Sequence, residues 1–186
     1  MQLSVVAFLL AVSTSCVTGG VESAESPTAN DQAVASQAAL EAATPTQISP
    51  DWTPLAEGWV TDLTGVLSDG RKRDLSEMLI AHRDVTTAEF AVLLVQDLRG
   101  EDIEVFALRV ATAWGLGQLA SSNGLLMVIA LDDRLVRLEV ADGLSASIPN
   151  SLAKRVIMED MAPALREARY GDAIQNALTT LMDASR

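Results

Sequence analysis

The stretch of sequence that decides the fold is residues 114–143, which read WGLG, a short serine-containing link, and then NGLLMVIALDDRLVRLEVADG. Residues 125–131 form an unbroken apolar run, which is typical of a strand buried on both faces. A polar turn of two aspartates and an arginine follows at 132–134. In residues 135–140 apolar side chains alternate with charged ones, which indicates a half-buried strand. The stretch therefore predicts a tight hairpin with polar groups at its ends.

The segments around this hairpin predict an α/β fold. Residues 89–95 (EFAVLLV) form a second apolar run, and apolar residues recur at helical spacing over 103–114 between the two runs. A strand, a helix and a strand in this order form a right-handed crossover whose two strands are parallel. Further helices are expected from Ser68, from Pro149 and from Gly171.

Composition bounds the function. The chain has 186 residues, enough for one ordinary domain and a tail, and its net charge of −12 argues against nucleic-acid binding. The single cysteine, Cys16, precedes the globular part, which excludes a disulfide, a cysteine metal site or a thiol nucleophile there.

The lone histidine, His82, falls on an apolar helix face, where a packed residue is more common than a catalyst. Pro163 is expected to kink or end the helix that starts at Pro149.

The N-terminus resembles an export signal. Residues 3–12 form an apolar run that is too short to span a bilayer and fits the core of a secretory signal. Ser13-Thr14-Ser15-Cys16 follows and resembles a bacterial lipobox, so we expect a signal peptide over residues 1–16 with acylation of Cys16. Cleavage by ordinary signal peptidase is the alternative. Either way the expected location is the periplasm or cell envelope.

Residues 17–54 are rich in alanine, serine, threonine and proline and hold acidic residues without a basic one. Such a composition predicts a disordered acidic tether that reaches on the order of 35 Å. The α/β domain is then expected over residues 55–186.

One edge of the predicted sheet gathers carboxylates. Asp97 follows the first apolar strand, and Asp132 and Asp133 follow the second. Because parallel strands end at the same edge, the three aspartates are expected to lie close together. Calcium or magnesium prefers oxygen ligands of this kind. An ordinary solvated turn is the alternative, since Asp-Asp-Arg is common turn chemistry.

A family resemblance rests on three groups of residues. Trp114-Gly115-Leu116-Gly117, Asn123-Gly124 and the hairpin through Val140 are similar to the core of a TPM domain. The resemblance covers about residues 59–182. It implies an α/β fold in a single TPM-like domain, with a mixed, mostly parallel sheet and helices on both faces.

The resemblance also implies candidate functions. TPM-domain proteins have been described as calcium-binding, as acid phosphatases and as auxiliary factors of membrane protein complexes. Their polar motif positions fall here on Asp62, Asn123, Asp132 and Asp133, as candidate metal ligands, and on Arg137, as a candidate substrate-binding residue. We therefore expect a lipid-tethered accessory domain that acts near an unidentified membrane protein complex, with calcium as its candidate ion and no organic cofactor. A metal-assisted acid phosphatase is the alternative.

Overall fold

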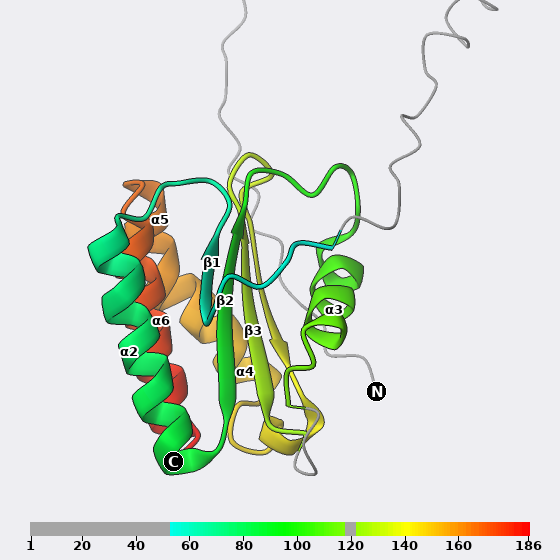
Figure 1. Cartoon of the computed structure of the whole chain (residues 1–186), viewed down its shortest axis with the longest axis vertical. Coiled ribbons are helices and arrows are strands. Elements are labelled where there is room, and N and C mark those ends of the chain that lie inside the picture. Colours follow the sequence, from blue (N-terminus) through cyan, green and yellow to red (C-terminus); the bar gives the residue numbers. More distant parts are fainter. Residues whose placement is uncertain (1–52, 118–121) are drawn as a thin grey trace, which may run out of the picture. The chain divides into compact units, whose positions relative to one another are not determined.

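A computed structural model describes residues 53–117 and 122–186 of the chain. Its centre is a four-stranded sheet in the order β1-β2-β3-β4 (Figure 1). The first three strands are parallel and the fourth is antiparallel, which confirms the mixed, mostly parallel sheet. The strands are β1 (Val60–Asp62), β2 (Glu89–Val95), β3 (Gly124–Ala130) and β4 (Leu135–Val140).

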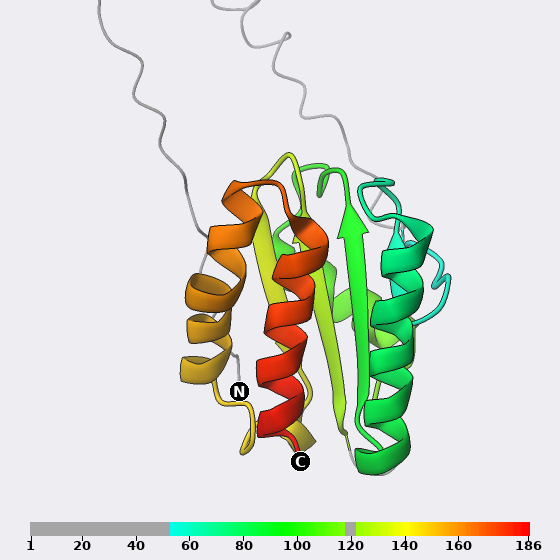
Figure 2. The same cartoon turned by 90° about the vertical axis from the view of Figure 1, so that its left-hand side faces the viewer.

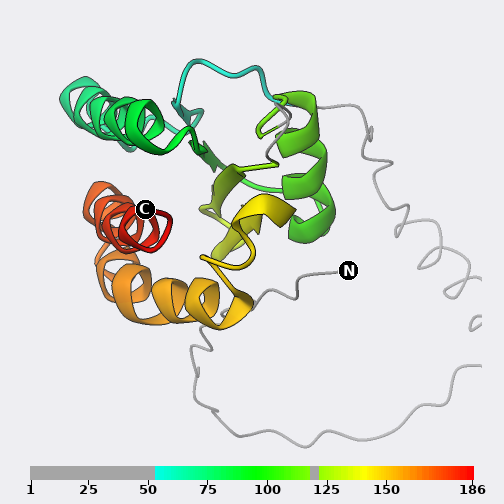
Figure 3. The ribbon, with the colours of Figure 1, turned by 90° about the horizontal axis from the view of Figure 1, so that it is seen from below.

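Helices cover both faces of the sheet, as the sequence predicts. Among the described residues α3 is the one helix on its face, and α2, α4, α5 and α6 lie on the other (Figure 3). On that crowded face α6 runs between α2 and the column of α4 and α5 (Figure 2). The helices are α2 (Asp69–Thr86), α3 (Ile103–Ala113), α4 (Asn150–Arg155), α5 (Ala162–Arg166) and α6 (Tyr170–Ala184), with a 3-10 turn η1 (Asp142–Leu144) and a π-helical segment η2 (Val156–Met161).

Strand β3 is buried along its whole length, which explains its unbroken apolar sequence. Its side chains alternate between two clusters: Leu125, Met127 and Ile129 pack with the α2 and α6 side, and the residues between them pack against α3. Each of these side chains is at most 2% exposed. Burial of one such side chain stabilises a fold by roughly 1.5–3 kcal/mol, so neither face tolerates a polar substitution here.

The helix after β4 changes its winding just before Pro163. A proline lacks the backbone N–H, and its ring crowds the carbonyl four residues earlier. The chain widens into η2 immediately before the proline and resumes as α5, with Pro163 in the first turn. The expected break is therefore confirmed as a π-helical segment, which keeps Val156 and Met161 in the core.

Two glycines of the WGLG and Asn-Gly motifs touch backbone to backbone. Gly117 has a φ of +69°, and a Cβ there would overlap the backbone nitrogen of Gly124. A Cβ on Gly124 would lie 2.7 Å from the carbonyl carbon of Leu116. The carboxylate of Glu89 accepts a hydrogen bond from the Gly117 N–H at 2.8 Å and holds this crossing against β2. Both glycines are therefore explained by packing, without a ligand.

We expect Gly124→Ala to destabilise the protein by about 1–3 kcal/mol, because the added methyl group must displace backbone atoms. The check is urea unfolding of this variant beside Gly70→Ala. Gly70 lies in α2, and a Cβ added there would meet its nearest neighbouring atom at 4.0 Å, so its substitution should not destabilise. Equal stability of the two variants would contradict the close-packing explanation.

His82 is a packed residue of α2, as its position on the apolar face predicts. The residue is 4% exposed, and its ring lies 4.9 Å from that of Phe90. The Nε2 atom is 3.0 Å from the hydroxyl of Ser185, which joins α2 to the end of α6. Burial lowers the pKa of His82, the charge of Arg186 lowers it further, and Asp183 acts in the opposite direction.

A lowered pKa makes the protein less stable in mild acid. The folded state disfavours protonated His82, so its contribution is fully present above about pH 6.5 and is lost as the pH falls through the folded pKa. We expect the melting temperature to fall as the pH is lowered from about 7.5 to about 5.5, and His82→Gln to flatten that dependence. Identical slopes for the two proteins would show that His82 is not the titrating group.

Candidate functional site

The carboxyl ends of the parallel strands meet at one edge of the sheet, the upper edge in Figure 1. The turn after β3 is tied there to the loop after β2. Asp132 accepts a hydrogen bond from the Gln96 side chain at 2.7 Å, and its own N–H donates to the Gln96 carbonyl at 2.8 Å. Asp133 accepts from the Leu98 N–H at 2.7 Å. These contacts confirm the predicted approach of the two segments.

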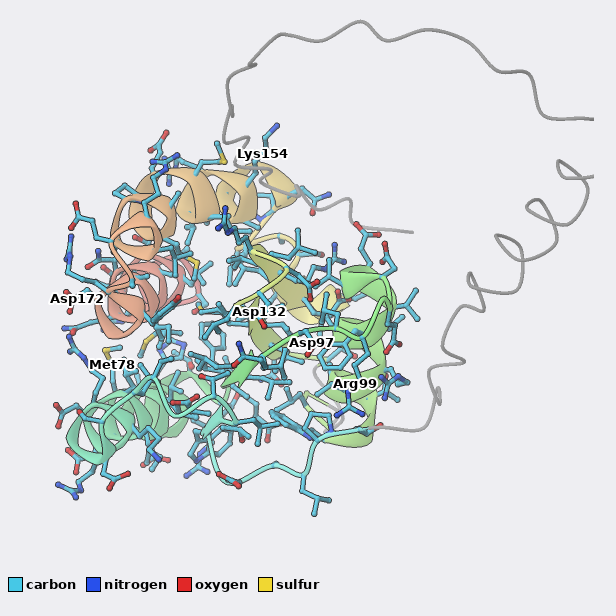
Figure 4. All side chains as sticks on the ribbon, turned by 90° about the horizontal axis from the view of Figure 1, so that it is seen from above. Met78, Asp97, Arg99, Asp132, Lys154 and Asp172 are labelled. Atoms are coloured by element: carbon cyan, nitrogen blue, oxygen red, sulfur yellow. The ribbon has the colours of Figure 1, made fainter. Side chains whose placement is uncertain are left out.

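Three carboxylates line this edge. Asp97 lies in the same loop as Gln96 and accepts a hydrogen bond from the Arg99 N–H at 2.8 Å. Figure 4, which looks down on the edge, shows Asp97 and Asp132 near each other, with Arg99 beyond them. In the part of the chain that the structure describes, Asp97, Asp132 and Asp133 form no salt bridge, and each engages one carboxylate oxygen. The second oxygens could bind a hard cation.

Asp62 ends β1 at the same edge but acts on its own loop. One oxygen accepts hydrogen bonds from the Thr64 N–H, the Thr64 hydroxyl and the Gly65 N–H, at 2.9, 2.6 and 3.0 Å. The other accepts from the Leu67 N–H at 2.8 Å. Burial raises the pKa of Asp62, but these four hydrogen bonds outweigh it and hold the pKa below its ordinary value. Asp62 is therefore the ionised centre of the loop that leads into α2.

Asn123 lies at the opposite end of the sheet. It precedes β3, its side-chain amide donates to the Thr87 carbonyl at 2.7 Å, and its own carbonyl accepts from the Glu89 N–H. The full length of β3, roughly 20 Å, separates it from Asp132. The structure therefore does not bring the four predicted ligands together: Asn123 positions the turn between α2 and β2, and Asp97 is the residue that accompanies Asp132 and Asp133.

Arg137 makes its contacts away from the three aspartates. It lies in the middle of β4, opposite Val128, and is 3% exposed. Its guanidinium donates to Glu104 of α3 at 3.0 Å and to Glu139 at 3.0 and 2.7 Å. Both partners are residues that the sequence analysis did not single out. Glu139 carries a weak signal, because residues two apart in a strand share a face, whereas Glu104 comes from a distant segment.

The predictions for the N-terminal part of the chain fall outside the residues that the structure describes. Cys16 and the predicted signal peptide lie outside them, as does the tether up to residue 52. None of the described helices is long and apolar enough to cross a membrane.

Within residues 53–117 and 122–186, no three histidine, cysteine or acidic residues are arranged as a closed metal-binding group. The three edge carboxylates would thus have to move or use water to complete an ion's coordination.

We expect Asp62→Asn to destabilise the protein by about 1–3 kcal/mol at pH 7, because an amide has one acceptor oxygen where the carboxylate uses two. The contribution of a carboxyl with a lowered pKa is present above its unfolded pKa of about 3.9 and is lost as the pH falls through the folded value. The difference from wild type in urea unfolding should therefore shrink in stronger acid. The exposed Asp84→Asn serves as the control, and an equal loss there would contradict this role.

Comparisons with known proteins agree with this architecture. The TPM domain family matches residues 60–184. The N-terminal domain of a P. gingivalis protein, solved by NMR, is 32% identical with a TM-score of 0.64 over 68% of this chain and 80% of that one.

Two other NMR structures share the fold at lower identity. The N-terminal domain of the cg2496 protein from Corynebacterium glutamicum is 15% identical, with a TM-score of 0.56 over 77% of this chain and 90% of its own. The BA42 protein from Bizionia argentinensis is 12% identical, with a TM-score of 0.58 over 66% and 83%. No curated protein matches the chain significantly. The match over residues 60–184 and the 32% identical relative show that this chain belongs to the TPM domain family.

Proposed function

We propose that this protein is an exported, lipid-tethered accessory domain that binds calcium weakly at the carboxyl edge of its sheet and acts beside a membrane protein. The observation that carries the calcium proposal is the group of Asp97, Asp132 and Asp133, which forms no salt bridge in the described part of the chain. Neighbouring carboxylates repel unless a cation or water separates them. Three oxygens are fewer than the six to eight that calcium takes, so water must supply the rest and the affinity should be millimolar.

The tether supports the accessory role. Sequence features over residues 1–54 favour export, acylation of Cys16 and a flexible link. The last residues of that link are fastened to α3: the Trp114 indole donates to the Pro54 carbonyl at 2.8 Å, and Arg109 donates to the Thr53 hydroxyl at 2.6 Å. These contacts fix the point at which the tether leaves the domain, which is beside α3.

The site chemistry favours binding over the phosphatase alternative. Arg137, which would stabilise a phosphoryl group, is buried between two carboxylates. His82 packs against Phe90 and bonds Ser185, so it is no general acid or base for the edge aspartates. An acidic edge also repels a phosphomonoester. An accessory domain needs none of these groups.

Calcium titration tests the proposal. We expect calcium at about ten times its Kd to stabilise the full chain by roughly 1.4 kcal/mol, which is a rise of a few degrees in melting temperature. The double variant Asp132→Asn/Asp133→Asn should lose that rise.

The matched control is Asp74→Asn/Asp84→Asn, which removes two charges from the exposed face of α2 and should keep the calcium response. No rise at about 10–20 mM calcium, well above a millimolar Kd, would exclude the ion site. Hydrolysis of p-nitrophenyl phosphate that disappears in the Asp132/Asp133 double variant would favour the phosphatase instead.

A further inference from the structure

A groove of about 810 Å³ runs between α3 and β4. Its position follows from the uneven coverage of the sheet. Within the described residues α3 alone covers its face (Figure 3), where it packs against both β3 and β4. The groove opens beside α3, and residues of β4 form its floor. The residues that matter below are Glu104, Val105, Leu108 and Thr112 from α3 and Arg137 and Glu139 from β4.

One wall of the groove is an apolar stripe that the fold leaves exposed. Val105 and Leu108 are each 57% exposed, and with Thr112 they follow one another at spacings of three and four residues along α3. Residues at this spacing share one side of a helix. Helix α3 has 11 residues and is thus about three turns long. The ridge from Val105 to Thr112 therefore spans about two turns of α3 and would match about two turns of a second helix.

The charges around the groove are mostly negative. Asp102, Glu104, Glu139 and Asp142 line it, with Arg137 as the basic residue among the described lining residues. The guanidinium of Arg137 already forms salt bridges with Glu104 and Glu139. Side chains of a partner that carry positive charge would meet unbalanced carboxylates at both ends of the groove, whereas negatively charged ones would be repelled.

We propose that this groove binds an amphipathic, basic helix of a partner protein. Its apolar side would pack against Val105, Leu108 and Thr112, and its lysines or arginines would flank Asp102 and Asp142. Amphipathic helices commonly bind grooves of this shape through residues at i, i+3, i+4 and i+7. The inference deepens the proposed accessory function, on which it rests, by naming what the domain recognises on a partner, and it requires neither calcium nor acylation.

A second copy of this chain fits the groove less well. It would present the same acidic residues, and the chain as a whole carries a net charge of −12. An extended segment would pair with the outer edge of β4, the last strand of the sheet, and would leave the ridge on α3 uncovered. A helix uses the ridge on α3 directly.

The test uses the full chain in calcium-free buffer and, as the probe, the idealised basic helix LKKLLKLLKKLLKL labelled with a fluorophore. We expect saturable binding by fluorescence anisotropy. The variant Leu108→Glu should weaken it roughly tenfold or more, as for an apolar residue at the centre of an interface.

The matched control is Val85→Glu on α2, where the wild-type side chain is 81% exposed and lies far from the groove. Both variants add one negative charge to the surface, so nonspecific attraction of a basic peptide would strengthen in both. Loss of binding in Leu108→Glu alone supports the proposal. Equal binding by both variants, equal binding of the acidic analogue LEELLELLEELLEL, or a Leu108-dependent dimer without peptide binding would each overturn it. A calcium result, positive or negative, leaves this test unaffected.

Discussion

The burial of β2 and β3 on both faces is the constraint on which the rest of the structure depends. Residues Val92 to Leu94 and Leu125 to Ala130 are at most 2% exposed, so both faces of these strands must be covered by apolar side chains. A chain of this length meets that demand with helices on each side, connected by crossovers that make the strands parallel. Parallel strands in turn end together, and this places the loops after β1, β2 and β3 at one edge.

The polar groups at that edge divide into two kinds. Asp62 is ionised and fully engaged by its own loop, so it stabilises the start of α2. In Asp97, Asp132 and Asp133, one carboxylate oxygen accepts a hydrogen bond from the loops at this edge, and the second oxygen could bind a ligand. A polar residue at a motif position therefore need not bind a ligand. The aspartate that follows β1 holds its own loop together, whereas the aspartates that follow β2 and β3 are candidate ligands.

The uneven coverage of the sheet creates the second feature of functional interest. On one face α2, α6 and the column of α4 and α5 fill the space over the strands, while on the other face α3 stands without a described helix beside it. The side of α3 toward β4 thus keeps exposed apolar residues, and the buried ion pairs of Arg137 close the floor beneath them. Both faces thus have a buried apolar core, and the face with the single described helix also has a groove beside that helix.

The sequence by itself determined the local structure. The run EFAVLLV, the hairpin with its polar turn and the cap at Ser68 appear as predicted, because strand periodicity, turn chemistry and capping depend on neighbouring residues. The parallel arrangement, and with it the approach of Asp97 to Asp132, also followed from the order of elements. Only the tertiary structure decided that Asn123 bonds Thr87 and that Arg137 is buried against Glu104. Those placements depend on which residues of separate segments meet when the helices pack on the sheet, and no spacing along the chain carries that information.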